Sequence, residues 1–413
     1  MEQKHLTSNG LHIYSYENSA LHGFCYSLYI KAGPLYESDR ENGISHFLEH
    51  VIIRNINALM GGRLYKELDL LGLSLNACTY KELIQITMSG ATEHLSRAAE
   101  IFAMVFADIV LNADQISVER NRIKAEIRED DEKTSLDFFT NRIIWRGTSL
   151  ENTITGSKSN LDSIGKKALT KAKRNFISAE NMFVYLTGNI ASDTVSKLSH
   201  EIERYSIPSK TTVRDNSACL PSSMFKRKCV PEIKNSDITA VRMSFDFDTS
   251  IASDAVYVLL FDILFEGDSC KMYQELSEKT GLIYSYTPYL ERYKNVGVLS
   301  FSYEVSPTKL IESVKICINV LKSVKAGLTD ELNYVIAPYT INSGMLLDSP
   351  EDLNWTMSYE AHILEKNLSS IKERSAEFSA VTANDIVNLA NHIFTKNNMT
   401  VTLKGNKKTV RLD

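Results

Sequence analysis

The chain repeats part of its own sequence, and this repetition constrains the fold more than any other feature. NMFVYLTGN at 181–189 is matched by NMTVTLKGN at 398–406, 217 residues later. LYKEL at 64–68 is matched by MYQEL at 272–276, 208 residues later, and a glycine follows each copy. Two matches in the same order indicate an internal duplication, with each copy forming one structural unit. We therefore expect two homologous domains.

The domain boundary falls in the polar segment between the two copies. Residues 207–225 are polar and carry Pro208 and Pro221, which is typical of a linker. We expect an N-terminal domain over 1–206 and a C-terminal domain over 226–413.

Strand-like runs alternate with longer helical patterns in both halves. The runs FCYSLYIKAG at 24–33, LIQITMSG at 83–90 and VRMSFDFD at 241–248 are the clearest. The alternation in 241–248 predicts a sheet with one buried face, lined by Val241, Met243, Phe245 and Phe247. The fold class expected is α+β, with two homologous domains that each form a mostly antiparallel sheet covered by helices.

Composition excludes several function classes. The formal net charge of −5 offers no concentrated basic face for nucleic acid. No run of 18 apolar residues occurs, so no membrane span is expected. Six cysteines are scattered without a C-x-x-C pair, which is typical of reduced thiols in a cytoplasmic protein.

The segment GISHFLEHVIIRN at 43–55 crowds two histidines and a glutamate into one helical turn. As a helix over 43–53 it has a continuous apolar stripe, formed by Ile44, Phe47, Leu48, Val51 and Ile52. His46 and His50 lie beside this stripe about 6 Å apart, close enough to reach one metal ion. Glu49 lies one turn from His46, so its carboxylate can approach a metal-bound water without being a ligand. H-x-x-E-H is the inverzincin pattern, and zinc needs a third protein ligand.

A second helical pattern covers SVERNRIKAEIRED at 117–130. Its apolar line is formed by Ile116, Ile123 and Ile127. Glu119 and Glu126 are seven residues apart, which places them two turns apart on one helix face.

With these two segments the sequence resembles the pitrilysin and insulinase family of zinc metallopeptidases. The resemblance is strongest to the half-length branch, which includes the mitochondrial processing peptidase. That family follows H-x-x-E-H with a ligand glutamate in an E-R-x5-E segment; here 75 residues lie between His50 and Glu126, and Glu119-Arg120 opens the segment. The resemblance implies one Zn²⁺ per chain, held by His46, His50 and Glu126, with a water in the open position.

The resemblance also implies roles for two further glutamates. Glu49 is expected to act as the general base and to hand the proton to the departing amine. Glu119 is expected to orient a ligand histidine or balance charge. The alternative for Glu119 is a solvated helix glutamate paired with Arg122 or Arg120.

The segment Asn76-Ala77-Cys78-Thr79 is similar to the family's N-A-x-T edge strand, which holds an extended substrate peptide by strand addition. Asn76 and Ala77 are therefore expected to bind substrate, although Asn76 also suits a simple turn or edge position. For Cys78 a role as a small buried hydrophobic residue is expected.

The second half departs from the family pattern at one position. Relatives carry R-E-K-R-G-L-x-Y, whose arginine and tyrosine grip the substrate; this chain has Ser277 for the first arginine and retains Tyr284. Tyr284 is expected to donate to the oxyanion, with a core aromatic as the alternative. The resemblance implies a clam-like dimer, and the missing arginine favours a heterodimer whose partner supplies the Arg and Tyr pair, with a homodimer still possible.

Two functions follow from these residues. The first is a zinc endopeptidase that cleaves peptides or removes a leader sequence from a precursor. The second is a non-catalytic scaffold or assembly subunit, because the same fold occurs in such roles. The intact set His46, Glu49, His50 and Glu126 favours the enzyme, whereas Ser277 is what the scaffold reading predicts.

Overall fold

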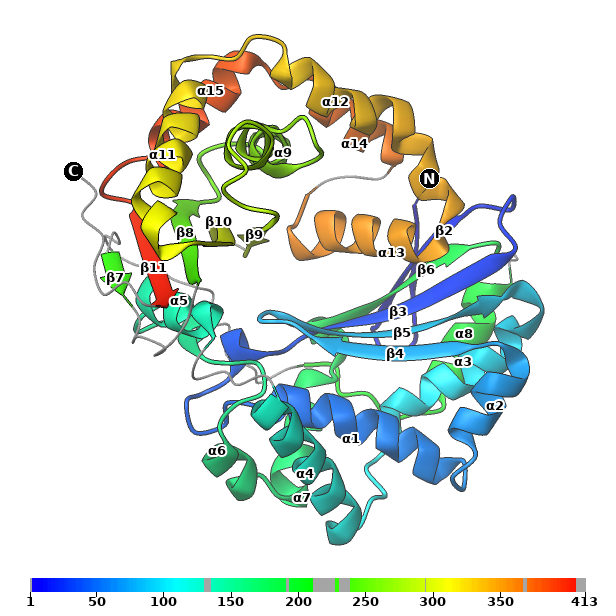
Figure 1. Ribbon diagram of the computed structural model, residues 1–413. Coiled ribbons are helices and arrows are strands. Elements are labelled where there is room, and N and C mark those ends of the chain that lie inside the picture. Colours follow the sequence, from blue (N-terminus) through cyan, green and yellow to red (C-terminus); the bar gives the residue numbers. More distant parts are fainter. Residues whose placement is uncertain are drawn as a thin grey trace. The chain divides into compact units, whose positions relative to one another are not determined.

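The chain forms two compact units, each built around one sheet. The computed structural model describes residues 2–129, 135–190, 193–210, 227–229, 238–293, 295–366 and 370–405. The first unit comprises Met1–Asp130, Asn152–Ser217 and Gly344–Ile371, and the second comprises Asp131–Glu151, Ala218–Ser343 and Lys372–Asp413 (Figure 1). Most of the linker predicted at 207–225 lies outside the described residues, from position 211 onward.

The first unit contains a six-stranded sheet in the order β1-β2-β6-β3-β5-β4. Among the strand pairs that the structure describes in this sheet, only β2–β6 is parallel. The strands are β1 (Gln3–Leu6), β2 (His12–Glu17), β3 (Gly23–Lys31), β4 (Ser74–Thr79), β5 (Leu83–Ala91) and β6 (Met182–Gly188). The helices of this unit are α1 (Ile44–Leu59), α2 (Leu64–Leu71), α3 (Leu95–Ala103), α4 (Ala113–Glu129), α6 (Lys158–Ser163), α7 (Lys166–Phe176), α8 (Thr194–Glu203) and α13 (Pro350–Ser358).

The second unit contains a five-stranded sheet in the order β7-β11-β8-β10-β9, of which only β7–β11 is parallel. The strands are β7 (Arg227–Cys229), β8 (Thr239–Asp248), β9 (Tyr286–Arg292), β10 (Val296–Val305) and β11 (Met399–Gly405). The helices are α5 (Leu136–Ile144), α9 (Asp254–Phe265), α10 (Lys271–Tyr273), α11 (Leu310–Ala326), α12 (Glu331–Ile341), α14 (Ile371–Ser379) and α15 (Ala383–Ile393). Two π-helices, η6 (Gln274–Glu278) and η9 (Tyr359–Ile363), continue α10 and α13.

The two sheets confirm the expected α+β fold and the repetition of one design. Reading outward from β6 and from β11, the strand orders and directions match through β3/β8, β5/β10 and β4/β9 on one side and β2/β7 on the other. The strands β6 and β11 carry the sequence repeat itself. Gly72 and Gly281, the glycines after the second repeated motif, both have a φ of +59°, a left-handed conformation that suits glycine.

Each half of the sequence supplies one helix to the sheet of the other half, which the expected domains 1–206 and 226–413 do not include. The helix α13 lies on the face of the first sheet opposite α1 (Figure 1). There Asn354 donates to the carbonyl of Tyr185 at 2.9 Å and accepts from the hydroxyl of Tyr29 at 2.9 Å. The helix α5 packs on β8 and β11 of the second sheet, where the hydroxyls of Thr140 and Thr402 are 2.6 Å apart.

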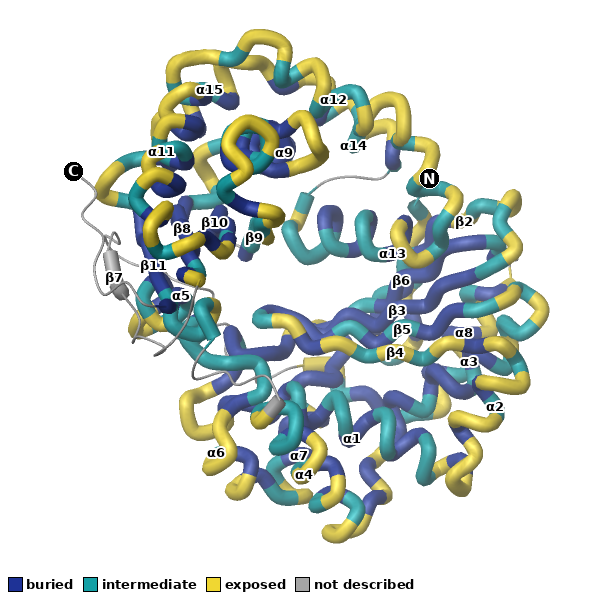
Figure 2. The backbone as a smooth tube through the Cα atoms, viewed as in Figure 1, coloured by how far each residue is buried: buried dark blue, intermediate teal, exposed yellow. Residues whose placement is uncertain are grey.

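The exchange corrects the expectation that β8 buries only one face. Its apolar side lies in the core as predicted, but the alternate residues Arg242, Ser244 and Asp246 are also at most 9% exposed. The guanidinium of Arg242 pairs with the carboxylate of Asp137 on α5, so the polar face of the sheet is covered by a helix that carries the opposite charge. Figure 2 shows the central strands as largely buried, which are β6, β3 and β5 in the first sheet and β11, β8 and β10 in the second.

Within the described part of the chain, no helix combines the length and the apolar character needed to cross a lipid bilayer.

Candidate metal centre

At the start of helix α1, a buried carboxylate accepts hydrogen bonds from backbone amides of the first turn. The carboxylate of Glu37 accepts from the amide of Gly43 at 2.9 Å and from the amide of Ser45 at 2.8 Å. These are N–H groups that the first turn of a helix leaves without a partner inside the helix. Gly43 has a φ of +95°, and a Cβ there would lie 2.6 Å from the carbonyl oxygen of Thr155. The start of the helix is thereby fixed against the segment that contains Gly156.

The apolar stripe predicted for α1 is buried. All five residues of the stripe are at most 5% exposed: Ile44, Phe47, Leu48, Val51 and Ile52. The stripe holds α1 against the sheet, so the histidines beside it are carried by a rigid element. The side chains of His46 and His50 are 13% and 18% exposed.

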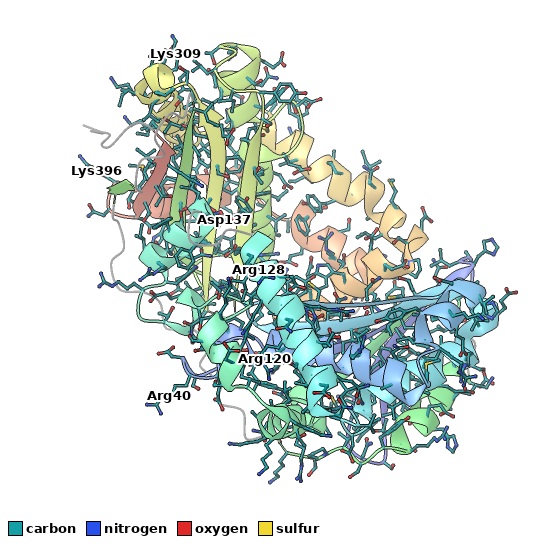
Figure 3. All side chains as sticks on the ribbon, turned by 60° about the horizontal axis from the view of Figure 1, so that its bottom comes forward. Arg40, Arg120, Arg128, Asp137, Lys309 and Lys396 are labelled. Carbon is teal, nitrogen blue, oxygen red and sulfur yellow. The ribbon has the colours of Figure 1, made fainter. Side chains whose placement is uncertain are left out.

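Three of the predicted site residues converge in space. The rings of His46 and His50 have centroids 4.7 Å apart and are nearly perpendicular. Glu126 of α4 brings one carboxylate oxygen to 3.7 Å from Nε2 of His46 and the other to 3.5 Å from Nε2 of His50. Figure 3 shows α4, the helix that carries Glu126, with Arg120 and Arg128 labelled on it.

These separations fit a metal ion. At 3.5 and 3.7 Å the nitrogen and oxygen atoms are too far apart for ordinary hydrogen bonds. A tetrahedral zinc with bonds of about 2.1 Å sets its ligand atoms about 3.4 Å apart. One ligand atom from each of His46, His50 and Glu126 lies within 4.8 Å of the others. Two imidazoles and a carboxylate are a donor set typical of catalytic zinc.

Arg120 explains how α4 is held at this position. Its guanidinium donates to the carbonyl oxygens of Leu161 at 3.0 Å and Ile164 at 2.9 Å, at the end of α6. It also lies over the ring of Phe47 on α1, at 5.6 Å. Arg120 therefore connects the two helices that carry the candidate ligands, and it does not pair with Glu119.

Glu119 lies behind His50, on the side away from Glu126. It is 1% exposed, and its carboxylate is 3.7 Å from Nδ1 of His50. The same carboxylate is 3.2 Å from Arg122 and 3.6 Å from Arg54. The pairing with Arg122 was an open alternative and is present, but the burial is incompatible with a solvated glutamate. Burial alone would raise the pKa of Glu119, and His50 with the two arginines lowers it below its ordinary value.

The two histidines differ in their affinity for protons. Burial, with a smaller contribution from His50, lowers the pKa of His46 to about 4. Burial also acts to lower the pKa of His50, but Glu119, Glu49 and Glu126 outweigh it and the pKa is raised. The lowered pKa of His46 favours its neutral form, which is the form of an imidazole that can bind a metal ion.

Glu49 stands apart from the three convergent residues. Its carboxylate accepts from the hydroxyl of Thr79 at 2.9 Å, which orients it. Burial raises its pKa above the ordinary value, against the opposing effect of His50. A carboxylate with a raised pKa is a better proton acceptor near neutral pH.

Asn76 and Ala77 lie on β4, the last strand of the first sheet, whose outer side has no neighbouring strand among the described residues. The predicted edge position is confirmed, and substrate binding there stays a prediction. Cys78 is exposed, so the expectation that it is buried was wrong: it points to the open face of an edge strand.

Tyr284 belongs to the second unit and is 95% exposed, which excludes the core aromatic considered as its alternative. Ser277 lies in the π-helix η6 that precedes it. A role for Tyr284 as a donor stays a prediction.

Sequence reasoning assigned no role to Arg54 or to the hydroxyl of Thr79. The signal for Arg54 was its position four residues after His50, on the same face of α1. Thr79 belongs to the N-A-x-T segment, but its contact with Glu49 could not be foreseen because that contact depends on how β4 crosses the helix.

Two family models match consecutive parts of the chain. Residues 16–158 match the model described as insulinase (peptidase family M16), and residues 163–334 match the model described as peptidase M16 inactive domain. The chain belongs to peptidase family M16. The candidate metal centre lies in the part that matches the first model. The sequence of the second half has no H-x-x-E-H pattern.

Two M16 relatives span nearly the whole chain, and a third matches a little under half of it. A protein of Rickettsia felis named "uncharacterized zinc protease" is 24% identical over 401 residues, covering 94% of this chain and 93% of its own length. The "uncharacterized zinc protease YmxG" of Bacillus subtilis is 22% identical over 404 residues, covering 96% of each. The beta subunit of the bovine mitochondrial-processing peptidase is 28% identical over 194 residues, covering 46% of this chain and 39% of its own.

Solved structures show the same fold. A protease from Helicobacter pylori superposes with a TM-score of 0.87 at 18% identity, covering 98% of this chain and 100% of its own. A chain of complex III2 from Candida albicans superposes with a TM-score of 0.78 at 14% identity, covering 98% and 95%.

Proposed function

We propose that the chain is a zinc-dependent endopeptidase that cleaves peptides or removes a leader sequence from a precursor. The observation that carries this proposal is the convergence of His46, His50 and Glu126 at separations suited to one zinc ion, with a second carboxylate, Glu49, nearby but outside that group. The proposal is supported by two relatives that are named zinc proteases.

The roles of the chain's own residues follow from their environments. His46, His50 and Glu126 would hold the ion, which when bound supplies Lewis-acid activation of a water and of the peptide carbonyl. Glu49, oriented by Thr79, takes a proton from the attacking water and returns it to the departing amine nitrogen. Glu119, whose carboxylate lies 3.7 Å from Nδ1 of His50, would orient that ring through its charge.

The substrate is proposed to bind as an extended strand along β4. The free edge of β4, the strand that carries Asn76 and Ala77, offers main-chain groups to a peptide in extended form. Thr79 at the end of the same strand contacts Glu49, so a peptide added to this edge runs past the proposed general base. Selection by the backbone makes the edge tolerant of many sequences.

The donor for the oxyanion is proposed to come from a homologous partner chain. Tyr284 is almost fully exposed, and Ser277 stands where relatives have an arginine. We propose a heterodimer in which the partner supplies an intact Arg and Tyr pair; a homodimer would use Tyr284. Mass measurement of the purified protein, alone and with candidate sister chains, tests this, and a fully active homodimer would contradict it.

We further propose a cytoplasmic location. The cysteines at 25, 78, 270 and 317 are free thiols, which suits a reducing compartment.

A non-catalytic scaffold is the second candidate function, supported by Ser277 and by the likeness to respiratory-complex subunits. Metal analysis and a quenched-peptide assay, with and without chelator, separate the two. The enzyme proposal requires about one zinc per chain, cleavage that chelator abolishes, and a Glu49→Gln variant that keeps zinc without cleaving. Glu41→Gln, an exposed carboxylate before α1, is the matched control and should cleave normally. Zinc-free protein or active Glu49→Gln would refute the mechanism.

A further inference from the structure

Aromatic side chains gather at the end of β4, on the sheet face away from the metal helix. Tyr80, directly after β4, is 36% exposed and lies 5.3 Å from the ring of Trp355. Trp355 in turn stacks on Tyr359 at 5.2 Å with an interplanar angle of 14°. Trp355 and Tyr359 are half-buried and come from α13 and η9, the helical segment contributed by the C-terminal half.

The aromatic cluster adjoins the proposed reaction centre through one residue. Thr79 donates to Glu49 on the α1 side of the sheet, and its neighbour Tyr80 reaches Trp355 on the α13 side. The outermost ring, Tyr359, is anchored by donation from its hydroxyl to Glu82 at 3.1 Å. The aromatic cluster is therefore held in place next to the strand residue that contacts the proposed general base, Glu49.

Uncharged polar residues continue the same face toward the free edge. The helix α13 packs on β3 and β6, while side chains of the outer strands remain partly exposed on this face: Asn76, Cys78, Gln85 and Thr87. Cys78 is paired in register with Gln85, which donates to the hydroxyl of Tyr29 at 3.1 Å. An exposed strip thus runs from β4 to the rings.

We infer that Tyr80, Trp355 and Tyr359 form a specificity subsite for an aromatic side chain of the peptide; this rests on the proposed function. A strand added to β4 alternates its side chains between the two sheet faces. The substrate side chains that point away from α1 then lie beside the β4 side chains opposite them on the same sheet face, with the two Cβ atoms about 5 Å apart. One of the two residues flanking the cleaved bond points to this face, where the stacked rings favour an aromatic ring over a small side chain. The nearby carboxylate of Glu82 disfavours an acidic side chain there.

Cleavage of a short Ala/Ser host peptide with a single Phe moved through it, against the same host with Ala or Asp, tests the selection. Wild type is expected to cleave the best-placed Phe peptide with kcat/KM roughly 10-fold above the Ala peptide, at the low end of discrimination by apolar pockets. Trp355→Ala and Tyr80→Ser should reduce the preference for the Phe peptide over the Ala peptide to about twofold or less. Tyr65→Ala, an exposed tyrosine on α2 of the same unit, should keep it. An unchanged preference in folded Trp355→Ala and Tyr80→Ser would overturn the inference, as would a preference for Asp.

A second measurement needs no catalysis. The chain has two tryptophans, and Trp145 is 1% exposed, so acrylamide quenching reports mainly on Trp355. In the zinc-loaded Glu49→Gln variant, the Phe peptide should protect Trp355 from acrylamide and the Ala peptide should not. Protection without cleavage by wild type would sink the proposed function and keep the subsite. Cleavage without protection or preference would keep the function and sink the subsite.

Discussion

Replacing Glu119 by Gln tests whether the buried carboxylate behind His50 tunes the metal centre. Nε2 of His50 faces Glu126 at 3.5 Å, while Nδ1 faces Glu119 at 3.7 Å, the arrangement in which a carboxylate orients a histidine ligand. Loss of such a partner costs about 10–100-fold in metal affinity, or about 1.4–2.7 kcal/mol. The effect on folding should be smaller, because Arg54 and Arg122, the other partners of Glu119, are 27% and 56% exposed and can be hydrated.

The assay is a zinc titration against a fluorescent chelator of known affinity, with thermal unfolding of the zinc-free protein measured in parallel. Asp114→Asn is the matched control, since it removes an exposed carboxylate from the same helix. Glu119→Gln should bind zinc at least 10-fold more weakly, and Asp114→Asn should match wild type. If Glu119→Gln bound zinc as tightly as wild type and only unfolded earlier, Glu119 would be a structural residue and the orienting role would be wrong.

Three further predictions concern protons and the helix start. As the pH drops below neutral, zinc affinity should decrease with a slope of one proton, because the pKa of His50 is raised and protonated His50 cannot bind the ion. A second proton should compete with zinc only near pH 4, the lowered pKa of His46. A two-proton slope near pH 6 would contradict this. Burial raises the pKa of Asp262 to about 7, so its contribution to stability is full below about pH 4 and is lost as pH rises through 7. Asp262→Asn should therefore stabilise the protein at pH 8 by up to about 4 kcal/mol and much less at pH 5, and equal effects in urea unfolding at both pH values would count against the assignment. Gly43→Ala should lower the melting temperature and weaken zinc binding, since the left-handed φ and the contact with Thr155 cost about 1–3 kcal/mol; an unchanged melting temperature would show that the helix start can relax.

The duplication and the metal centre were predictable because both depend on short-range or repeated patterns. A 217-residue repeat fixed which strands correspond, and the period of α1 placed His46 and His50 on one side of a buried stripe. Glu126 lies far from them along the chain, and its assignment came from the resemblance, not from periodicity. The structure brings it within 3.7 Å of both rings.

The helices α5 and α13 could not be assigned to their sheets from the sequence. A helical pattern shows which of its faces is apolar, but not which sheet receives that face. The burial of Arg242 could not be predicted for the same reason. The alternation in β8 indicates one solvated side unless a second helix is known to cover it. The aromatic cluster at Tyr80 was missed for the same reason, since its partners Trp355 and Tyr359 lie in the exchanged segment.

The exchange of α5 and α13 has a consequence for how the protein is made. During synthesis the first sheet emerges long before residues 344–371, so its α13 face, including Tyr29 and Tyr185, stays bare until most of the chain has left the ribosome. A fragment cut at the linker would keep α5 but lack α13. We expect such a fragment to aggregate or to bind chaperones. It should stay soluble and monomeric only when the missing helix is supplied as a separate peptide.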